Sequence, residues 1–136
     1  MRVLVYFLGF LFIFSLPVIG MESGSSSEKV EQGRYLVHHV ARCIECHTPR
    51  NSKGELDRSR LFRGAPVPVK SPFANEQWAF RAPAIAGLSG WSEREAIHLL
   101  TKGKRESGHR PRAPMPDYQM TQEDAAAIVS YLKSLD

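Results

Sequence analysis

The chain has 136 residues but only two cysteines, Cys43 and Cys46, and just two residues separate them. A disulfide that closes so short a loop would add little to the stability of a whole fold, so we expect these thiols to do other chemistry. The sequence also lacks an internal repeat and the polar–apolar alternation that is typical of β-strands. Its basic residues are scattered among acidic ones, which excludes a nucleic-acid footprint. The modest net charge of +4 is suited to docking on an acidic protein surface.

Residues 1–20 have the order of a secretory signal. Arg2 is followed by an apolar run over residues 3–16, then by the helix breaker Pro17, and Gly20 offers a small residue for cleavage. The run is shorter than the roughly 20 residues that a bilayer span needs. We therefore expect residues 1–20 to be a signal peptide, with an uncleaved N-terminal membrane anchor as the alternative. Either reading places the protein in the periplasm or another extracytoplasmic space, and the second one adds attachment to the membrane.

The remaining sequence predicts a flexible linker over residues 21–27 and one all-α domain over residues 28–136. Polar serines and glycine dominate the linker. Apolar residues then recur at helical spacing from Glu28 and predict a first helix that runs directly into Cys43. Residues 48–90 are rich in proline and glycine and predict loops. So long a stretch of loop suits a domain that wraps a large apolar ligand in place of part of its core.

Two further helices carry clear boundary signals. Ser92 and Glu95 form an S-x-x-E capping box, and Gly103 is the natural end of that helix. Thr121 opens the last helix, whose apolar face continues as far as Leu135. The sequence thus predicts three main helices joined by long loops.

The segment Cys43–His47 reads C-x-x-C-H, which is the attachment signature of c-type haem. Two thiols at this spacing can add to the two vinyl groups of one porphyrin, and His47 then lies beneath the iron as the proximal ligand. We therefore expect one covalently bound haem c and its iron as the cofactor. A thioredoxin-like thiol pair is an alternative, but no β-α-β pattern surrounds it. Half of a zinc site is another, with ligands drawn from the histidines at 38, 39, 98 and 109.

A low-spin electron-transfer haem needs a second axial ligand, and Met115 is the first candidate. It lies between Pro114 and Pro116, which restrict the backbone, and a weak thioether bond to iron needs a rigid loop. A soft thioether favours ferrous iron and raises the reduction potential. Met120 is the second candidate, although it could instead pack on the first turn of the last helix. His109 would give bis-histidine ligation, but it lies among arginines, where a solvated loop histidine is expected.

Several stretches beside the C-x-x-C-H motif match one known family. They are Gly33–Val37, Cys46–Thr48, Ala82–Gly87, Gly90–Ser92, Pro114–Pro116 and Asp124–Leu135. With these stretches the sequence resembles the class I cytochrome c domain over most of residues 28–136, and bacterial periplasmic single-haem modules in particular. The resemblance implies the cytochrome c fold, with Cys43 and Cys46 holding the haem and His47 and Met115 ligating the iron.

The resemblance also implies specific contacts. The first and last helices of the family cross, which would bring Gly33 and Leu36 near Tyr131 and Leu132. Related modules often have Pro-Asn-Ile where this chain has alanine after Pro83. A backbone carbonyl of that proline segment would still be able to orient His47. Trp78, Arg81 and Tyr118 are the candidates to bind the haem propionates, and His38 and His39 are expected to be structural or exposed rather than ligands.

These features predict one-electron transfer without a substrate, because both axial positions of the iron would be occupied. The protein would then be an electron carrier rather than an enzyme, with a dehydrogenase or an oxidase as its redox partner. Lys102, Lys104 and Arg105 are candidates for the docking surface. One alternative is a dedicated haem subunit of a dehydrogenase or oxidase complex. Another is a gas-binding or peroxide-reactive haem protein, which would require that Met115 is not a ligand.

Overall fold

A computed structural model of the chain describes residues 25–74 and 77–135. The predicted signal over residues 1–20 lies outside these residues. Within them the chain forms four α-helices, a π-helical turn, two short 3₁₀ turns and one pair of strands. These are α1 Ser26–Tyr35, the π turn Leu36–Val40, α2 Cys43–His47, the 3₁₀ turn Arg58–Arg60, β1 Ala65–Pro66, β2 Arg81–Ala82, the 3₁₀ turn Ala86–Leu88, α3 Glu93–Lys102 and α4 Gln122–Lys133. None of the helices in the described ranges is both long enough and apolar enough to cross a membrane.

Helix α1 begins two residues before the predicted start at Glu28. Ser25 caps it, because its Oγ accepts a hydrogen bond from the Glu28 N–H at 3.4 Å. The Glu28 carboxylate in turn accepts from the Ser25 N–H at 2.6 Å, which completes a capping box. Ser26 and Ser27 therefore belong to the helix and not to the predicted linker.

The prediction that the first helix runs directly into the cysteine motif is wrong. It widens into the π turn Leu36–Val40, and Arg42 then adopts a left-handed conformation with φ of 52°. A right-handed helix needs a negative φ at every residue, so the helical run ends at Arg42. The chain restarts as the separate short helix α2 at Cys43, so a three-helix description misses this element.

The predicted starts of the two later helices and the predicted end of α3 at Gly103 are confirmed, whereas α4 ends at Lys133, two residues before Leu135. Ser92 Oγ accepts from the Glu95 N–H at 3.2 Å, and Gly103 closes α3 in the left-handed conformation. Thr121 Oγ1 accepts from the Asp124 N–H at 3.1 Å at the start of α4. Each signal acts within one helical turn, so the surrounding fold does not override it.

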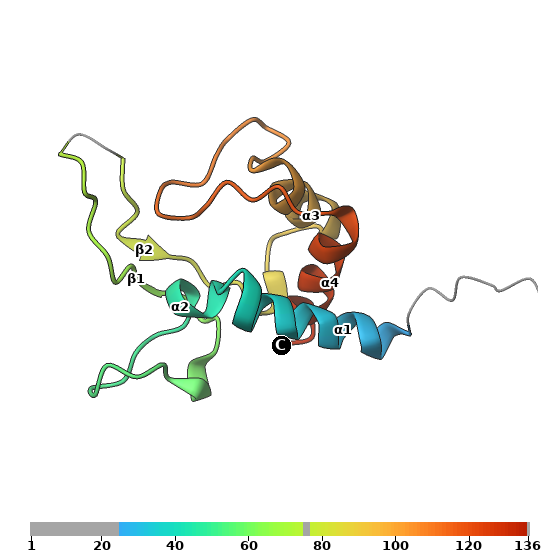
Figure 1. Cartoon of the computed structure of the whole chain (residues 1–136), viewed down its shortest axis with the longest axis horizontal. Helices are drawn as coiled ribbons and strands as arrows, with labels where there is room; N and C mark the ends of the chain where they lie inside the picture. The colour runs from blue at the N-terminus through green and yellow to red at the C-terminus, as the bar shows by residue number, and fades with distance from the viewer. Residues whose placement is uncertain (1–24, 75–76, 136) are drawn as a thin grey trace, which may run out of the picture.

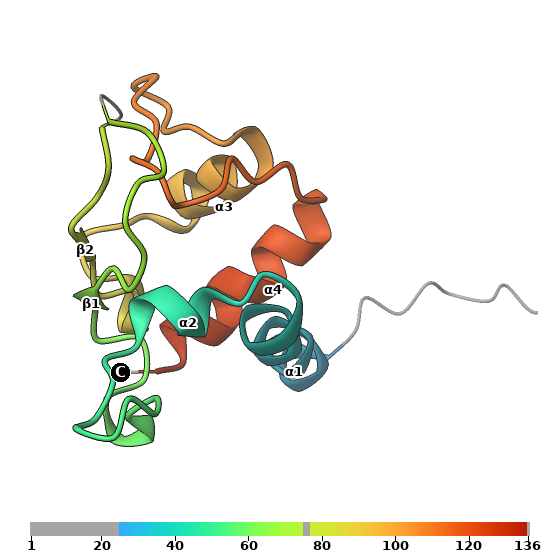
Figure 2. The same cartoon turned by 60° about the vertical axis from the view of Figure 1, so that its left-hand side comes forward.

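Helix α4 lies between α1 and α3, and both helices pack against it (Figures 1 and 2). Gly33 of α1 is buried where it meets α4, beside Tyr131, as the resemblance implies. The core gathers apolar side chains of α2, α3, α4, the π turn, the loop after α2 and the 3₁₀ turn Ala86–Leu88. Its members larger than alanine are Val37, Ile44, Phe62, Leu88, Leu100, Ile128, Val129, Tyr131 and Leu132.

Residues 48–90 are mostly loop, as predicted, but they also contain the unpredicted strand pair. Strands β1 and β2 are antiparallel, with Ala65 opposite Ala82 and Pro66 opposite Arg81. The pair lies at the side of α2 (Figure 1). Two residues per strand are too few to produce a visible alternation, so local sequence could not have indicated them.

Candidate haem-attachment site

Helix α2 carries the whole C-x-x-C-H motif. Cys43 and Cys46 are free thiols and are half-buried, whereas only 7% of His47 is exposed. Burial raises the pKa of the Cys43 thiol to about 11, so this group is neutral at physiological pH. Because α2 is only five residues long, little more than one helical turn positions the side chains of Cys43, Cys46 and His47 relative to one another.

A hydrogen bond to a distant backbone carbonyl fixes the His47 ring. Its Nδ1 lies 2.8 Å from the carbonyl oxygen of Pro83. A carbonyl can only accept, so Nδ1 carries the proton and Nε2 keeps its lone pair for a metal. Burial lowers the pKa of His47, which also favours the neutral ring. The expectation that the proline segment orients His47 is confirmed.

A short segment after α2, residues 62–64, joins the two sides of this hydrogen bond. The Phe62 N–H donates to Thr48 Oγ1 at 3.0 Å, and the Gly64 N–H donates to the His47 carbonyl at 2.8 Å. On the other side, the Phe62 carbonyl accepts from the Ile85 N–H at 2.8 Å. Sequence reasoning missed this segment. Its only local signal is a glycine within a proline-rich loop, which does not reveal a partner so far along the chain.

Met115 lies half-buried in a loop with several anchors. Its N–H donates to the Arg112 carbonyl at 3.3 Å, and the Ala113 carbonyl accepts from the Ala79 N–H at 2.7 Å. An ion pair of 2.6 Å between Arg110 and Asp117 spans the same loop. These contacts restrain the segment that carries the predicted distal ligand, while its ligation of iron stays a prediction.

The two alternative distal ligands lie in different surroundings. Met120 packs against the hydrophobic core, and its N–H donates to the Leu100 carbonyl at 3.0 Å. His109 is exposed in a turn, where its carbonyl accepts from the Arg105 N–H at 2.8 Å. Met120 thus packs in the core and His109 is solvated, which are the roles expected from the sequence for each residue if it is not an iron ligand.

Two of the three candidates for the haem propionates use their polar atoms elsewhere. Trp78 Nε1 donates to the Val69 carbonyl at 2.9 Å, and the Tyr118 hydroxyl donates to the Ala41 carbonyl at 2.8 Å. Burial raises the pKa of Tyr118 to about 12, so its hydroxyl keeps the proton that it donates. Arg81 lies exposed on β2.

The remaining predicted residues are structural or lie on the surface. His38 Nε2 lies 3.1 Å from the Tyr131 hydroxyl, and His39 is exposed beside Tyr35. Both were expected to be structural or exposed, which is confirmed. Arg105 stacks over the Trp91 ring at 4.0 Å, so this candidate docking residue also supports local packing. Lys102 and Lys104 are exposed.

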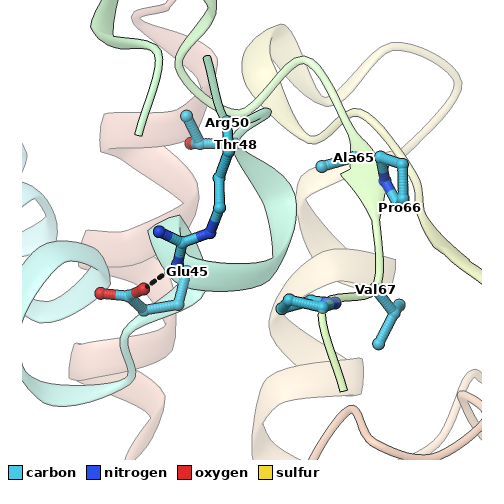
Figure 3. A pocket seen from close by; sticks show the side chains of 7 residues that line it. Glu45, Thr48, Arg50, Ala65, Pro66 and Val67 are labelled. Carbon is cyan, nitrogen blue, oxygen red and sulfur yellow. Dashed lines mark hydrogen bonds and ion pairs between the residues drawn. The ribbon is translucent and has the colours of Figure 1, made fainter. Parts of the chain in front are cut away.

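A surface hollow lies beside α2 but does not include the haem-attachment side chains. Glu45, Thr48 and Arg50 line it on one side, and β1 with the residues after it lines the other (Figure 3). The Arg50 guanidinium pairs with the Glu45 carboxylate at 2.8 Å within it. Glu45 also pairs with Arg42 at 3.1 Å, so its charge is compensated locally.

The donor atoms fit haem c better than zinc. In the described part of the chain, no three His, Cys, Asp or Glu side chains converge closely enough to hold a metal ion. The alternative of a zinc site with histidines at 38, 39, 98 or 109 therefore finds no support. Two unpaired thiols one turn apart and an imidazole with a free Nε2 are instead the groups that covalent haem attachment and axial ligation need.

The chain belongs to the cytochrome c family, which it matches over residues 30–136. Membership confirms the resemblance in the sequence and implies haem c, iron and electron transfer. The helical architecture agrees with that assignment.

Curated relatives include cytochrome subunits of dehydrogenases. The chain is 32% identical over 115 residues to the fructose dehydrogenase cytochrome subunit of Gluconobacter japonicus, covering 76% of this chain and 21% of the relative. It is 33% identical over 116 residues to a diheme cytochrome c-type protein of Cereibacter sphaeroides, covering 81% and 36%. It is 26% identical over 131 residues to the cytochrome c subunit of the quinone alcohol dehydrogenase of Gluconobacter oxydans, covering 85% and 26%. This chain thus spans only a minor part of the length of each relative.

Proposed function

We propose that this protein transfers single electrons through one haem c that is covalently attached to Cys43 and Cys46, with His47 and Met115 as the axial ligands. Haem supplies an iron that changes its oxidation state by one electron. The observation that supports the proposal best is the 2.8 Å hydrogen bond from His47 Nδ1 to the Pro83 carbonyl. It holds the ring in the tautomer whose Nε2 can bind iron, and ligating histidines are typically held in this way.

The two proposed ligands have complementary effects on the reduction potential. The Pro83 carbonyl withdraws the Nδ1 proton of His47 slightly, which makes Nε2 a better electron donor and favours ferric iron. The thioether of Met115 is soft and favours ferrous iron. With both side chains bound, the iron has no open position for oxygen or peroxide. A carrier therefore explains the site better than a catalyst does.

The anchored loop supports Met115 as the distal ligand over Met120. Its backbone is tied to Ala79 through Ala113, and the Arg110–Asp117 ion pair restrains it further. A preorganised loop loses less conformational entropy when a weak ligand binds. Met120, in contrast, already contributes to the core, so ligation would remove it from that packing.

The relatives favour a dehydrogenase as the redox partner. Two of them are cytochrome subunits of fructose and alcohol dehydrogenases, so we propose that this domain accepts electrons from an enzyme of that kind. It would do so either as an independent carrier or as a dedicated subunit of the complex. The apolar segment near the N-terminus suggests export to the periplasm, with membrane attachment if it is not cleaved.

The test is an absorption spectrum of the protein, oxidised and reduced, after expression in a host that matures c-type cytochromes. A haem stain on a denaturing gel is run beside it. We expect covalent haem and a sulfur-to-iron charge-transfer band in the oxidised protein. Met115→Ala should abolish that band, whereas the matched control Met120→Ala should keep it.

Each other outcome contradicts a defined part of the proposal. No covalent haem would reject haem attachment to Cys43 and Cys46. Covalent haem without the band would reject methionine ligation, and loss of the band only in Met120→Ala would exchange the two methionines. Binding of carbon monoxide by the untreated reduced protein would indicate an open iron position and would favour a gas-binding or peroxide-reactive protein.

A further inference from the structure

We infer that Gly64 is a positioning residue that sets the strength of the hydrogen bond between His47 and Pro83, and through it the reduction potential. The inference rests on the proposed role of His47 as an iron ligand. Gly64 has no side chain, so it acts through the two backbone segments that it holds together.

The first part of the argument is a set of backbone hydrogen bonds. Gly64 N–H donates to the His47 carbonyl at 2.8 Å, which ties residue 64 to the end of α2. Two residues earlier, the Phe62 carbonyl accepts from the N–H groups of Ile85 and Ala86 at 2.8 and 3.2 Å. The segment 62–64 therefore links the peptide of the proposed ligand to the chain that follows Pro83.

The second part is the close approach of Gly64 to the Pro83 segment. A β-carbon at Gly64 would lie 2.8 Å from the Ala84 nitrogen, 2.9 Å from the Ala82 oxygen and 3.0 Å from the Pro83 carbonyl carbon. All three are backbone atoms, so no flexible side chain can move aside. The peptide that presents its oxygen to His47 thus packs directly against a position where only glycine fits.

The neighbouring residues make this link rigid. Phe62 is fully buried and has a φ of 56°, an unusual conformation for a bulky residue that the surrounding packing must hold in place. Its N–H donates to the hydroxyl of Thr48, which is 1% exposed. A displacement at Gly64 is therefore transmitted to the 83–84 peptide and is not absorbed within the loop.

The direction of the effect follows from this geometry. An added methyl group would act as a wedge between residue 64, which stays bonded to the His47 carbonyl, and the Pro83 carbonyl. The Nδ1–Oxygen distance would then increase and the hydrogen bond would weaken. A weaker bond makes the imidazole a poorer donor, which disfavours ferric iron and raises the midpoint potential.

The experiment compares Gly64→Ala with Gly54→Ala and Gly108→Ala in the haem-loaded protein. The φ values of the three glycines are 80°, 81° and 84°, so alanine is strained equally at each position. Of these three positions, only Gly64 has other atoms within 4 Å of the added β-carbon. The two controls therefore carry the same backbone strain without the wedge.

Two quantities are measured in each variant: the midpoint potential by spectroelectrochemical titration, and the Nδ1–H resonance of His47 by proton NMR of the reduced, ¹⁵N-histidine-labelled protein. We expect Gly64→Ala alone to raise the potential. In the same variant the resonance should move upfield and exchange faster with water. General destabilisation would not produce this combination.

A second variant keeps the test decisive if Gly64→Ala does not fold. Thr48→Val removes the acceptor of the Phe62 N–H with little change of shape and should shift both quantities in the same direction by a smaller amount. Its control is Thr101→Val, because the Thr101 hydroxyl donates to the His98 carbonyl within α3 and makes no hydrogen bond to the segment 62–64. Covalent haem with both quantities unchanged, or shifted equally in the controls, would overturn the inference. Absence of covalent haem in the unmodified protein would instead reject the proposed function.

Discussion

Gly33 of α1 lies so close to Ala127 of α4 that a β-carbon on Gly33 would overlap with the Ala127 carbonyl oxygen. The two helices cross with their backbones in contact at this point. Gly33→Ala should therefore force them apart and destabilise the protein by about 1–3 kcal/mol or more, as overpacking of a core does. Urea unfolding of the haem-loaded protein, followed by circular dichroism, measures this change.

A loss of stability in Gly33→Ala would be informative, because the helix propensity of alanine alone would stabilise the variant. Alanine in a helix is favoured over glycine by roughly 0.5–1 kcal/mol. Lys29→Ala, at an exposed position of the same helix, is the control and should leave the free energy of unfolding nearly unchanged. A Gly33→Ala variant as stable as this control would show that α1 and α4 do not approach so closely.

The capping box at the start of α3 gives a second stability prediction. Ser92 Oγ satisfies the Glu95 N–H, and the Glu95 carboxylate accepts from the Ser92 N–H at 3.1 Å. Ser92→Ala should lower the free energy of unfolding by about 1 kcal/mol. The exposed neighbour Ser89 provides the matched control, Ser89→Ala, which should have almost no effect. Equal urea midpoints for the two variants would contradict the cap.

The helix boundaries that could be predicted from sequence are those fixed by local contacts. Ser92, Gly103 and Thr121 each act on atoms within one turn of chain, so their signals were sufficient. Ser25 gives the same kind of signal with Glu28, but the surrounding serines had been interpreted as linker. The left-handed Arg42 could not have been predicted, because arginine has no intrinsic preference for that conformation.

The site divides in the same way. The C-x-x-C-H motif is local and was visible at once, whereas the partner of His47 lies in a different part of the chain and was expected only from the family resemblance. Gly64 was missed because its importance depends on which backbone packs against it, and this contact exists only in the folded chain. Tyr118 is one of three sequence candidates for the propionates, yet its hydroxyl donates to the Ala41 carbonyl just before the motif.

That hydrogen bond of Tyr118 makes a third prediction. Tyr118→Phe removes the donor to Ala41 and leaves a half-buried carbonyl without it, so we expect a loss of about 0.5–1.5 kcal/mol in the free energy of unfolding. Haem attachment should be retained, because the hydrogen-bond partner of the hydroxyl is the Ala41 backbone carbonyl and not a side chain of the motif. Tyr35→Phe is the control, since Tyr35 is 55% exposed. Complete loss of covalent haem in Tyr118→Phe would instead support a direct role at the cofactor.

We expect His38 to make the stability of the protein depend on pH. It lies 3.1 Å from the Tyr131 hydroxyl and packs edge-on against the Phe62 ring. Burial lowers the pKa of His38, and the positive charges of Arg34, His39 and Arg58 add to that effect. In the unfolded chain the pKa of a histidine is about 6.5.

The sign follows from which state binds more protons. Between the unfolded pKa of His38 and its lower folded pKa, the unfolded chain is the more protonated, so stability falls as the pH falls. The stabilisation is fully present above about pH 6.5 and is lost as the pH drops through the folded pKa. We expect urea midpoints of the haem-loaded protein, measured from pH 8 to pH 5, to decrease more steeply for the wild type than for His38→Gln. His39→Gln should give a slope between these two, because it removes only one of the smaller contributions to the lowered His38 pKa. Parallel curves for the wild type and His38→Gln would show that His38 has the same proton affinity in both states.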